Sequence, residues 1–192
     1  MKKIKCFFKR KLFPSVCISL VIHAWEQHKL HELAEINPKN SLPLKFEYVD
    51  LESVVGTEIR MHRTEYKETA PSRAQRVAQN GDVFYQTVRP YQKNNCIFNN
   101  DGNEWVFSTG YAQLRPKYNG YFLLTLLQNE YFVREVLDRC TGTSYPAINS
   151  SDLSKIIVKY PKNVKEHEMI GDFFKNLDDI LTLYQRKPFF SF

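Results

Sequence analysis

The chain has 192 residues, of which 43% are hydrophobic and 14% aromatic, and its formal net charge is +6. This length and hydrophobic content exclude a disordered segment and indicate one sizeable core with room for an appendage. Six cations and no acid lie among residues 1–11, so the rest of the chain is neutral overall. Residues 60–93 hold seven basic and three acidic side chains, a local +4. That charge fits a footprint for phosphates and an ordinary solvated face equally well.

The N-terminal residues 1–24 combine a basic start with an apolar run at residues 12–22. This order imitates a secretory signal with Ala24 as the cleavage residue, and it leaves a secreted β-rich binding protein as an alternative. The run is too short to span a bilayer, and Ile22 is large for the third position before the cut. We therefore expect an atypical basic and apolar leader on a cytoplasmic chain that does not enter a membrane.

Residues 25–114 are expected to be rich in strands. Residues 25–36 fit a short helical or extended element, and residues 45–55 alternate apolar and acidic side chains as in a half-buried strand. Residues 57–76 are polar and basic, and they predict a long loop or a loop with a short helix. Turn sequences then precede two further strands, predicted at residues 83–88 and 104–114.

Apolar side chains at helical spacing predict one helix from Gly120 through Arg139, packed against the sheet. A hydroxyl-rich loop at residues 140–152 and a strand at residues 156–158 follow it. The sequence therefore predicts an α/β (α+β) fold, with a β-rich domain and packed helices followed by one long C-terminal helix.

The long C-terminal helix is predicted from about Val164, with Asn163 and Glu166 three residues apart as in a capping box. Pro188 ends it before an exposed apolar tail at residues 188–192. Its apolar residues form a stripe wider than one side of a lone helix needs, so we expect them to contact a partner helix or the domain itself. These residues are Ile170, Phe173, Phe174, Leu177, Ile180, Leu181 and Tyr184.

The sequence carries no motif for catalysis. It has no glycine-rich phosphate loop, no nucleophile elbow, no His-Glu-x-x-His and no Asn-Pro-Pro-aromatic motif of adenine methyltransferases. The four cysteines are irregularly spaced, and His28 and His31 have no third ligand nearby, which disfavours zinc and favours reduced thiols. We expect a protein that is not an enzyme and that uses no metal and no cofactor.

Residues 72–117 carry the strongest functional signal, SRAQRVAQNGDVFYQTVRPY and then WVFSTGYAQLRPK. Arg, Gln, Ser and Thr on short loops between strands are side chains that hydrogen-bond base edges and phosphates. The order S-R-A, G-D-V, V-R-P, S-T-G-Y-A and L-R-P resembles the target-recognition domain of type I restriction-modification specificity subunits. A start W-E-x-x-x-L-x-E-L-x-E-I at residues 25–36 and a T-G-T loop at residues 141–143 extend the resemblance over residues 25–187.

The resemblance implies a non-catalytic subunit that binds double-stranded DNA and directs a methylation subunit and a restriction subunit to half of a bipartite site. It implies a target-recognition domain at residues 25–162, a coiled-coil spacer helix at residues 163–187 and a tail at residues 188–192. The chain departs from the family pattern because it has one recognition domain and a short spacer. A half-subunit that pairs with itself through the C-terminal helix is one consequence; a truncated, inactive remnant or a silent recombination cassette is the alternative.

Polar side chains of the loops are the candidate DNA contacts. They are Arg73, Gln75, Arg76, Arg89, Tyr91, Lys93, Thr141, Thr143 and Ser144. Arg89 has the alternative role of tying the strand end to a neighbouring carboxylate. The hydroxyls at residues 141–144 have the alternative role of satisfying their own turn.

Overall fold

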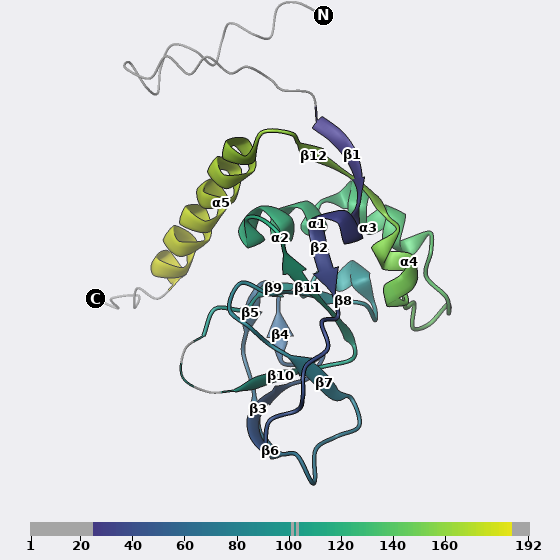
Figure 1. Cartoon of the computed structure of the whole chain (residues 1–192), viewed down its shortest axis with the longest axis vertical. Coiled ribbons are helices and arrows are strands. Elements are labelled where there is room, and N and C mark those ends of the chain that lie inside the picture. Colours follow the sequence, from purple (N-terminus) through teal and green to yellow (C-terminus); the bar gives the residue numbers. More distant parts are fainter. Residues whose placement is uncertain (1–24, 101, 103, 186–192) are drawn as a thin grey trace, which may run out of the picture.

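The structure, a computed structural model, describes residues 25–100, 102 and 104–185. The leader predicted at residues 1–24, the tail predicted at residues 188–192 and the predicted stop at Pro188 lie outside these residues. Figure 1 shows helices at one end, a central sheet beside them, and a second sheet at the far end. The predicted α/β (α+β) class, with a β-rich domain and a long final helix, is confirmed.

The central sheet has the strand order β2-β11-β8-β9, and all neighbours are antiparallel. Its strands are β2 (Ala34–Ile36), β8 (Val83–Gln86), β9 (Cys96–Ile97) and β11 (Tyr111–Pro116). All four side chains of β8 are buried, because its two faces meet different layers. Val83 and Tyr85 pack under the helices, and Phe84 packs toward the second sheet. The strand predicted at residues 83–88 is confirmed as β8, although it ends at Gln86.

The second sheet has the strand order β6-β3-β10-β7, with β3 and β10 parallel and the other pairs antiparallel. Its strands are β3 (Lys45–Val49), β6 (Arg63–Tyr66), β7 (Ala74–Val77) and β10 (Trp105–Ser108). Aromatic rings fill the space between the sheets. Phe84 of β8 stacks on Phe107 of β10, with ring centroids 3.6 Å apart and planes inclined by 7°.

The single strand predicted at residues 104–114 is wrong, because the chain forms β10 and β11 with a turn at Thr109 and Gly110. The two strands belong to different sheets. Gly110 sits so close to Leu51 that an added Cβ would lie 2.7 Å from the Leu51 side chain. Its carbonyl accepts hydrogen bonds from the Thr87 amide at 2.9 Å and the Thr87 hydroxyl at 2.7 Å. This tight turn moves the chain from one sheet to the other.

The long loop predicted at residues 57–76 is also wrong. It contains β5 (Glu58–Ile59), which forms a hairpin with β4 (Val54–Val55), and then β6 and the start of β7. β6 is an edge strand whose side chains are exposed or half-buried, so it lacks the apolar alternation of a half-buried strand. The strand predicted at residues 45–55 is confirmed as β3, but it ends at Val49 and pairing resumes only at β4.

The first and last strands of the domain lie side by side (Figure 1). β1 (Trp25–Lys29) pairs antiparallel with β12 (Ile157–Pro161). Two short helices adjoin these strands: α1 (Leu30–Leu33) follows β1, and α4 (Ser150–Ser154) precedes β12. A short 3-10 helix, η2 (Pro90–Gln92), follows β8. The element predicted at residues 25–36 is therefore a strand, one helical turn and β2. The strand predicted at residues 156–158 runs further than expected and includes Pro161.

The single helix predicted from Gly120 through Arg139 is two helices, α2 (Gly120–Gln128) and α3 (Glu130–Leu137). Asn129 separates them, because its backbone ends α2 and its side-chain oxygen accepts from Tyr131 N at 2.8 Å as the N-cap of α3. Asn119 caps α2 in the same way, accepting from Phe122 N at 3.0 Å. The apolar spacing continues across the break, so periodicity alone does not reveal it.

The final helix, α5 (Val164–Gln185), begins where the sequence predicts. Asn163 Oδ1 accepts from Lys165 N at 3.0 Å, and the Glu166 carboxylate accepts from Trp25 Nε1 at 3.0 Å. The helix runs beside α2, and its first turns bury His167 and Gly171 against the domain. Further along, six of the predicted partner contacts are at least 36% exposed, whereas Ile170 packs against the core of the domain. We call the six the α5 apolar face: Phe173, Phe174, Leu177, Ile180, Leu181 and Tyr184.

Neither a membrane span nor a metal cluster occurs in residues 25–185 as far as they are described. No helix there is long and apolar enough to cross a bilayer, and no three His, Cys, Asp or Glu side chains converge as a metal site requires. Cys96 and Cys140 are free thiols. Cys96 is fully buried, and desolvation raises its pKa to about 12, so it is an unreactive core residue.

Candidate nucleic-acid interface

Arg73 and Arg89 line one cavity of about 550 Å³, which we call the Arg89 cavity. Arg73 lies directly before β7 and Arg89 follows β8, so the two arginines come from different sheets. Tyr145, from the loop between α3 and α4, lines the same cavity. The other lining residues are Leu51, Glu52, Val54, Val55, Gln86, Val88, Gln92 and Asn94. The cavity thus gathers two cations, one acid and three amides beside four aliphatic side chains.

Arg89 is held in an unusual conformation at the end of β8. Its backbone is left-handed, with φ 53° and ψ 55°, and its amide donates to Pro146 O at 2.8 Å. The guanidinium lies over the Tyr145 ring, 4.3 Å from the ring centroid. The sequence suggests an ion pair between Arg89 and a carboxylate as an alternative role. Within the described residues the side chain of Arg89 instead contacts an aromatic ring. A guanidinium stacked in this way keeps its in-plane N–H donors available.

The hydroxyl-rich loop is closed by its own backbone. Thr141 N donates to Ala147 O at 2.9 Å, and Ala147 N donates back to Thr141 O at 3.0 Å. Gly142 has φ 86°, a conformation that favours glycine. Thr143 and Ser144 are exposed on the closed loop, and Tyr145 follows them. The loop therefore presents Tyr145 to Arg89, and the sequence gives no sign of this because the two residues are far apart in the chain.

Arg76 and Gln75 are engaged by the protein itself. Arg76 is half-buried, its Nε donates to Tyr111 O at 3.4 Å, and burial lowers its pKa. Gln75 is exposed and its Nε2 donates to Ser72 O at 2.8 Å. The prediction that Gln75 and Arg76 lie on a loop is wrong, because both belong to strand β7. Of the three predicted residues only Arg73, which precedes the strand, lines the Arg89 cavity.

Tyr91 and Lys93 lie on and after the short 3-10 helix η2. Tyr91 is half exposed, and Lys93 donates from Nζ to the Glu130 carboxylate of α3. This hydrogen bond lowers the pKa of Glu130. The ion pair leaves Lys93 partly neutralised, while Tyr91 is exposed but does not line the Arg89 cavity.

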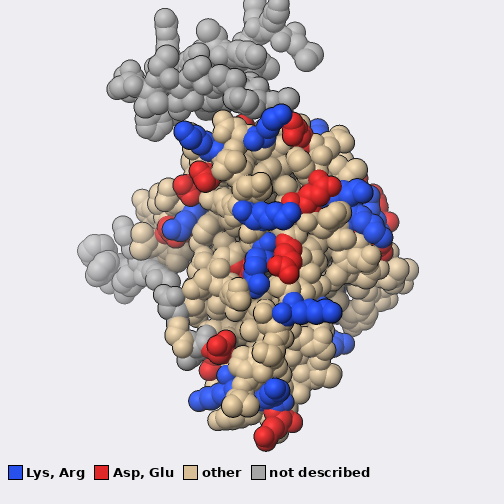
Figure 2. All heavy atoms as spheres, in the orientation of Figure 1, with Lys and Arg blue, Asp and Glu red and all other residues tan. Residues whose placement is uncertain are grey.

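Acidic side chains from outside residues 60–93 form ion pairs with two of the arginines that contribute to the net charge of +4 in this segment. Arg60 pairs with Glu58 at 2.7 Å, and Arg63 pairs with Asp50 at 2.9 Å. On the face in Figure 2, Lys and Arg side chains alternate with Asp and Glu, and no broad area of one sign covers the described atoms. This face therefore offers individual basic side chains rather than a broad positive field to an anionic ligand.

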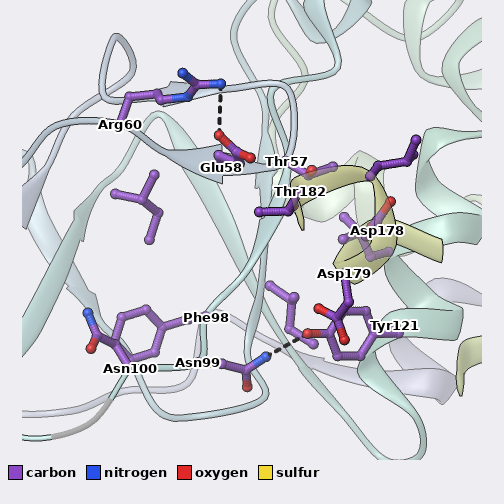
Figure 3. A pocket seen from close by; sticks show the side chains of 14 residues that line it. Thr57, Glu58, Arg60, Phe98, Asn99, Asn100, Tyr121, Asp178, Asp179 and Thr182 are labelled. Atoms are coloured by element: carbon purple, nitrogen blue, oxygen red, sulfur yellow. Dashed lines mark hydrogen bonds and ion pairs between the residues drawn. The ribbon is translucent and has the colours of Figure 1, made fainter. Parts of the chain in front are cut away.

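A second cavity, of about 860 Å³, lies between α5 and the β4–β5 hairpin (Figure 3). Asp178 and Asp179 of α5 line it together with Glu58, whose carboxylate pairs with Arg60. Burial raises the pKa of Asp178, and the neighbouring Asp179 adds to the shift. An acidic wall disfavours phosphate, so this cavity is not a candidate for contact with DNA.

Two sheets with polar loops at their edges, followed by one amphipathic helix, are the features of a recognition domain. The chain belongs to the type I restriction modification DNA specificity domain family, whose model matches residues 23–188. The resemblance seen in the motifs of residues 25–187 is thereby confirmed.

Known relatives agree with this family. The chain is 26% identical to the specificity subunit of the type I restriction enzyme HindI from Haemophilus influenzae over 120 residues, which cover 59% of this chain and 26% of that protein. The HsdS subunit from Thermoanaerobacter tengcongensis superposes with a TM-score of 0.67 and 27% identity, over 85% of this chain and 44% of that one. A chain from the type I R-M system gives a TM-score of 0.70 at 24% identity, over 91% and 45%, a likeness of fold alone. This chain spans less than half the length of each of these relatives.

Proposed function

We propose that the chain is a non-catalytic reader of DNA sequence in a type I restriction-modification system. It directs a methylation subunit and a restriction subunit, which supply the catalysis, to one half of a bipartite site in cytoplasmic DNA. The observation that carries this proposal is the family match over residues 23–188. The relative from Haemophilus influenzae is itself named a specificity subunit.

The polar edge around the Arg89 cavity supports the assignment of the DNA contacts. Arg73 and Arg89 supply donors for base edges or phosphates, and Tyr91, two residues after Arg89, is exposed. The exposed Thr143 and Ser144 hydroxyls lie on the loop that carries Tyr145. One domain of this size makes few phosphate contacts, so its affinity is modest and falls with salt by a slope proportional to that small number of contacts.

The α5 apolar face supports a helical partner. An amphipathic helix whose apolar side is exposed is stabilised when that side packs on a second helix. The methylation subunit or a second copy of this chain supplies that helix in the proposed complex. Pairing of two copies through α5 is two-fold symmetric, so the DNA site of such a complex is an interrupted palindrome.

A DNA-binding assay tests the proposal directly. The full chain, alone and with the methylation subunit, is mixed with genomic DNA fragments and an excess of poly(dI·dC), and the retained fragments are sequenced. We expect the retained fragments to share a short sequence motif and their affinity to fall linearly with salt on a log–log scale. Fragments without a common motif, or no retention at low salt, would contradict the proposal.

A further inference from the structure

We propose that the Arg89 cavity receives the major-groove edge of a guanine, with Arg89 as the residue that reads it and Tyr145 as the residue that positions Arg89. This inference rests on the proposed function and deepens it, because it names one base and one specificity-determining side chain. The loop residues predicted from sequence include Arg89 but not Tyr145, and they do not distinguish base contacts from phosphate contacts.

The first argument is the orientation of the Arg89 donors. The Tyr145 ring covers one face of the guanidinium at 4.3 Å, which fixes its plane and leaves the in-plane N–H groups to bind a ligand. No ion pair of Arg89 occurs among the residues that the structure describes. Arginine in this state offers two parallel donors, and the guanine edge in the major groove offers two acceptors, O6 and N7.

The second argument is that the backbone is built to hold this side chain. Three non-glycine residues have positive φ in the described chain, and two of them, Arg89 and Lys93, flank η2. Pro146 O accepts from Arg89 N at 2.8 Å, and Arg89 O accepts from Gln92 N at 3.0 Å. Left-handed conformations at non-glycine residues persist only where the surroundings fix them, and they concentrate at ligand sites.

The third argument is the chemistry of the cavity wall. Gln86 is 2% exposed, and its Nε2 donates to Val88 O at 2.7 Å and to Gln92 Oε1 at 2.9 Å. Its Oε1 is shielded from solvent, so it does not offer an acceptor to a ligand in the cavity. The cavity as a whole holds two guanidinium groups against the single carboxylate of Glu52. An acceptor-only edge fits such a site, whereas adenine presents an N–H donor beside its N7.

The aliphatic and aromatic lining favours a base over a phosphate. Four aliphatic side chains line the cavity together with the ring of Tyr145: Leu51, Val54, Val55 and Val88. Burying a flat base edge against such surfaces costs less desolvation free energy than burying a charged phosphate. A phosphate contact at Arg89 is instead one of the outcomes that the experiment distinguishes.

Arg63 provides a matched control within the same chain. Its guanidinium also lies over a tyrosine ring, 4.7 Å from the Tyr48 centroid. Unlike Arg89, it donates from Nε to Glu65 at 2.7 Å and from Nη1 to Asp50 at 2.9 Å, so these donors are already engaged. A stacked arginine whose donors are occupied by carboxylates is not expected to read a base.

The test is selection of bound duplexes from a random-sequence DNA pool by the full chain and its variants. The wild-type chain should enrich guanine at one position. Arg89→Lys keeps the charge but loses the paired donors, so preference at that position should fall about 5- to 150-fold, with preferences elsewhere retained. Tyr145→Leu should weaken the same preference, Tyr145→Phe should restore it, and Arg63→Lys should leave it unchanged. In the selected duplex, 7-deazaguanine at that position should weaken wild-type binding but not binding by Arg89→Lys.

Each contrary result has a distinct meaning. If Arg89→Lys and Tyr145→Leu select the same guanine as the wild type, the inference is wrong while DNA reading stands. If Arg89→Ala weakens binding to all sequences equally, Arg89 contacts a phosphate and the inference is also wrong. If the folded wild-type chain enriches no sequence, both the inference and the proposed function are overturned. Unfolding midpoints of the variants, measured beside the selection, separate loss of reading from loss of fold.

Discussion

Arg115 and Asp82 form a two-contact ion pair, with Nε to Oδ1 and Nη2 to Oδ2 both at 3.0 Å. Asp82 belongs to the G-D-V motif before β8, and Arg115 belongs to the L-R-P motif at the end of β11. Asp82 is almost fully buried and accepts two more hydrogen bonds, from Gln113 Nε2 at 2.6 Å and from Gln79 N at 2.9 Å. Two of the motifs that mark the family are therefore joined by one structural contact, away from the candidate DNA edge.

Asp82→Asn should lower the free energy of unfolding by about 2–4 kcal/mol, because an amide N–H₂ would face several N–H donors. This expected loss of unfolding free energy is smaller than for a fully buried ion pair, because the Arg115 side chain is 27% exposed. Urea unfolding measures the change. The matched control Glu135→Gln breaks the surface pair with Arg139 and should cost less than about 1 kcal/mol. Equal losses in the two variants would show that the Asp82 contact has no special role.

Gly171→Ala should loosen α5 from α2. A Cβ at Gly171 would lie 2.1 Å from Asn119 Oδ1, which is also the oxygen that caps α2. Helix propensity alone favours alanine by about 1 kcal/mol, so a loss of protection can only reflect the clash. Hydrogen exchange of the α5 amides should become faster in this variant. The control Asn176→Ala, at an exposed position of the same helix, should leave hydrogen exchange unchanged or make it slower. Unchanged or slower exchange in Gly171→Ala would contradict the close contact between Gly171 and Asn119.

His167 should make the stability of the domain depend on pH. It is buried against the rings of Tyr118, Phe122 and Tyr160, and desolvation lowers its pKa, with Glu166 and Glu168 opposing the shift. The unfolded chain binds a proton below about pH 6.5 and the folded chain binds it only at lower pH, so this contribution to stability is full above about pH 6.5 and is lost as the pH falls.

The His167→Phe variant isolates this effect. The slope of unfolding free energy between about pH 7.5 and pH 5 should be shallower in the variant than in the wild type, by at most about 1.4 kcal/mol per pH unit. Urea titrations at a series of pH values give both slopes. Identical slopes would mean that His167 titrates equally in the folded and unfolded chains.

Leu177→Asp should disrupt docking of the α5 apolar face while the domain remains folded. Leu177 is 40% exposed in the single chain, and a buried carboxylate at a helix–helix contact is strongly unfavourable. Sedimentation velocity reports self-association, and pull-down with the methylation subunit reports the other partner. Asn176→Asp adds the same charge at a neighbouring exposed position and should change neither measurement. Leu177→Asp with wild-type behaviour in both assays would exclude α5 as the docking surface.

Arg73→Ala should weaken DNA binding by about 1–3 kcal/mol, because the side chain lines the Arg89 cavity. Arg76→Ala should act mainly on stability, because that guanidinium is half-buried and donates to Tyr111 O. Fluorescence anisotropy with a selected duplex gives the first quantity, and urea unfolding gives the second. If Arg73→Ala leaves binding unchanged, the assignment of Arg73 to a DNA contact is wrong.

Elements with a strong local pattern could be predicted from the sequence. β8 is a continuous apolar run, and α5 has a single apolar stripe after a capping Asn163. The break at Asn129 and the turn at Gly110 could not be predicted, because apolar residues continue on both sides of each. The polar residues 57–76 contain the edge strand β6, whose pairing depends on β3, a partner that sequence periodicity does not identify.

The candidate site was predictable only in part. Arg73 and Arg89 are named by the motifs, and the cavity brings them together. Tyr145 was missed because its contact with Arg89 depends on the closure of a distant loop between Thr141 and Ala147. The counted charge of residues 60–93 overstates the positive surface, because acids from other segments pair with Arg60 and Arg63.

The most direct test of the account is methylome sequencing of a host strain with this gene intact, deleted, and restored. The account predicts that methylation at one bipartite DNA motif disappears on deletion and returns on restoration. Restoration with Arg89→Lys should return methylation with relaxed sequence preference in one half of that motif. Identical methylomes in the three strains would contradict a working reader of DNA sequence and would favour an inactive remnant or a silent cassette.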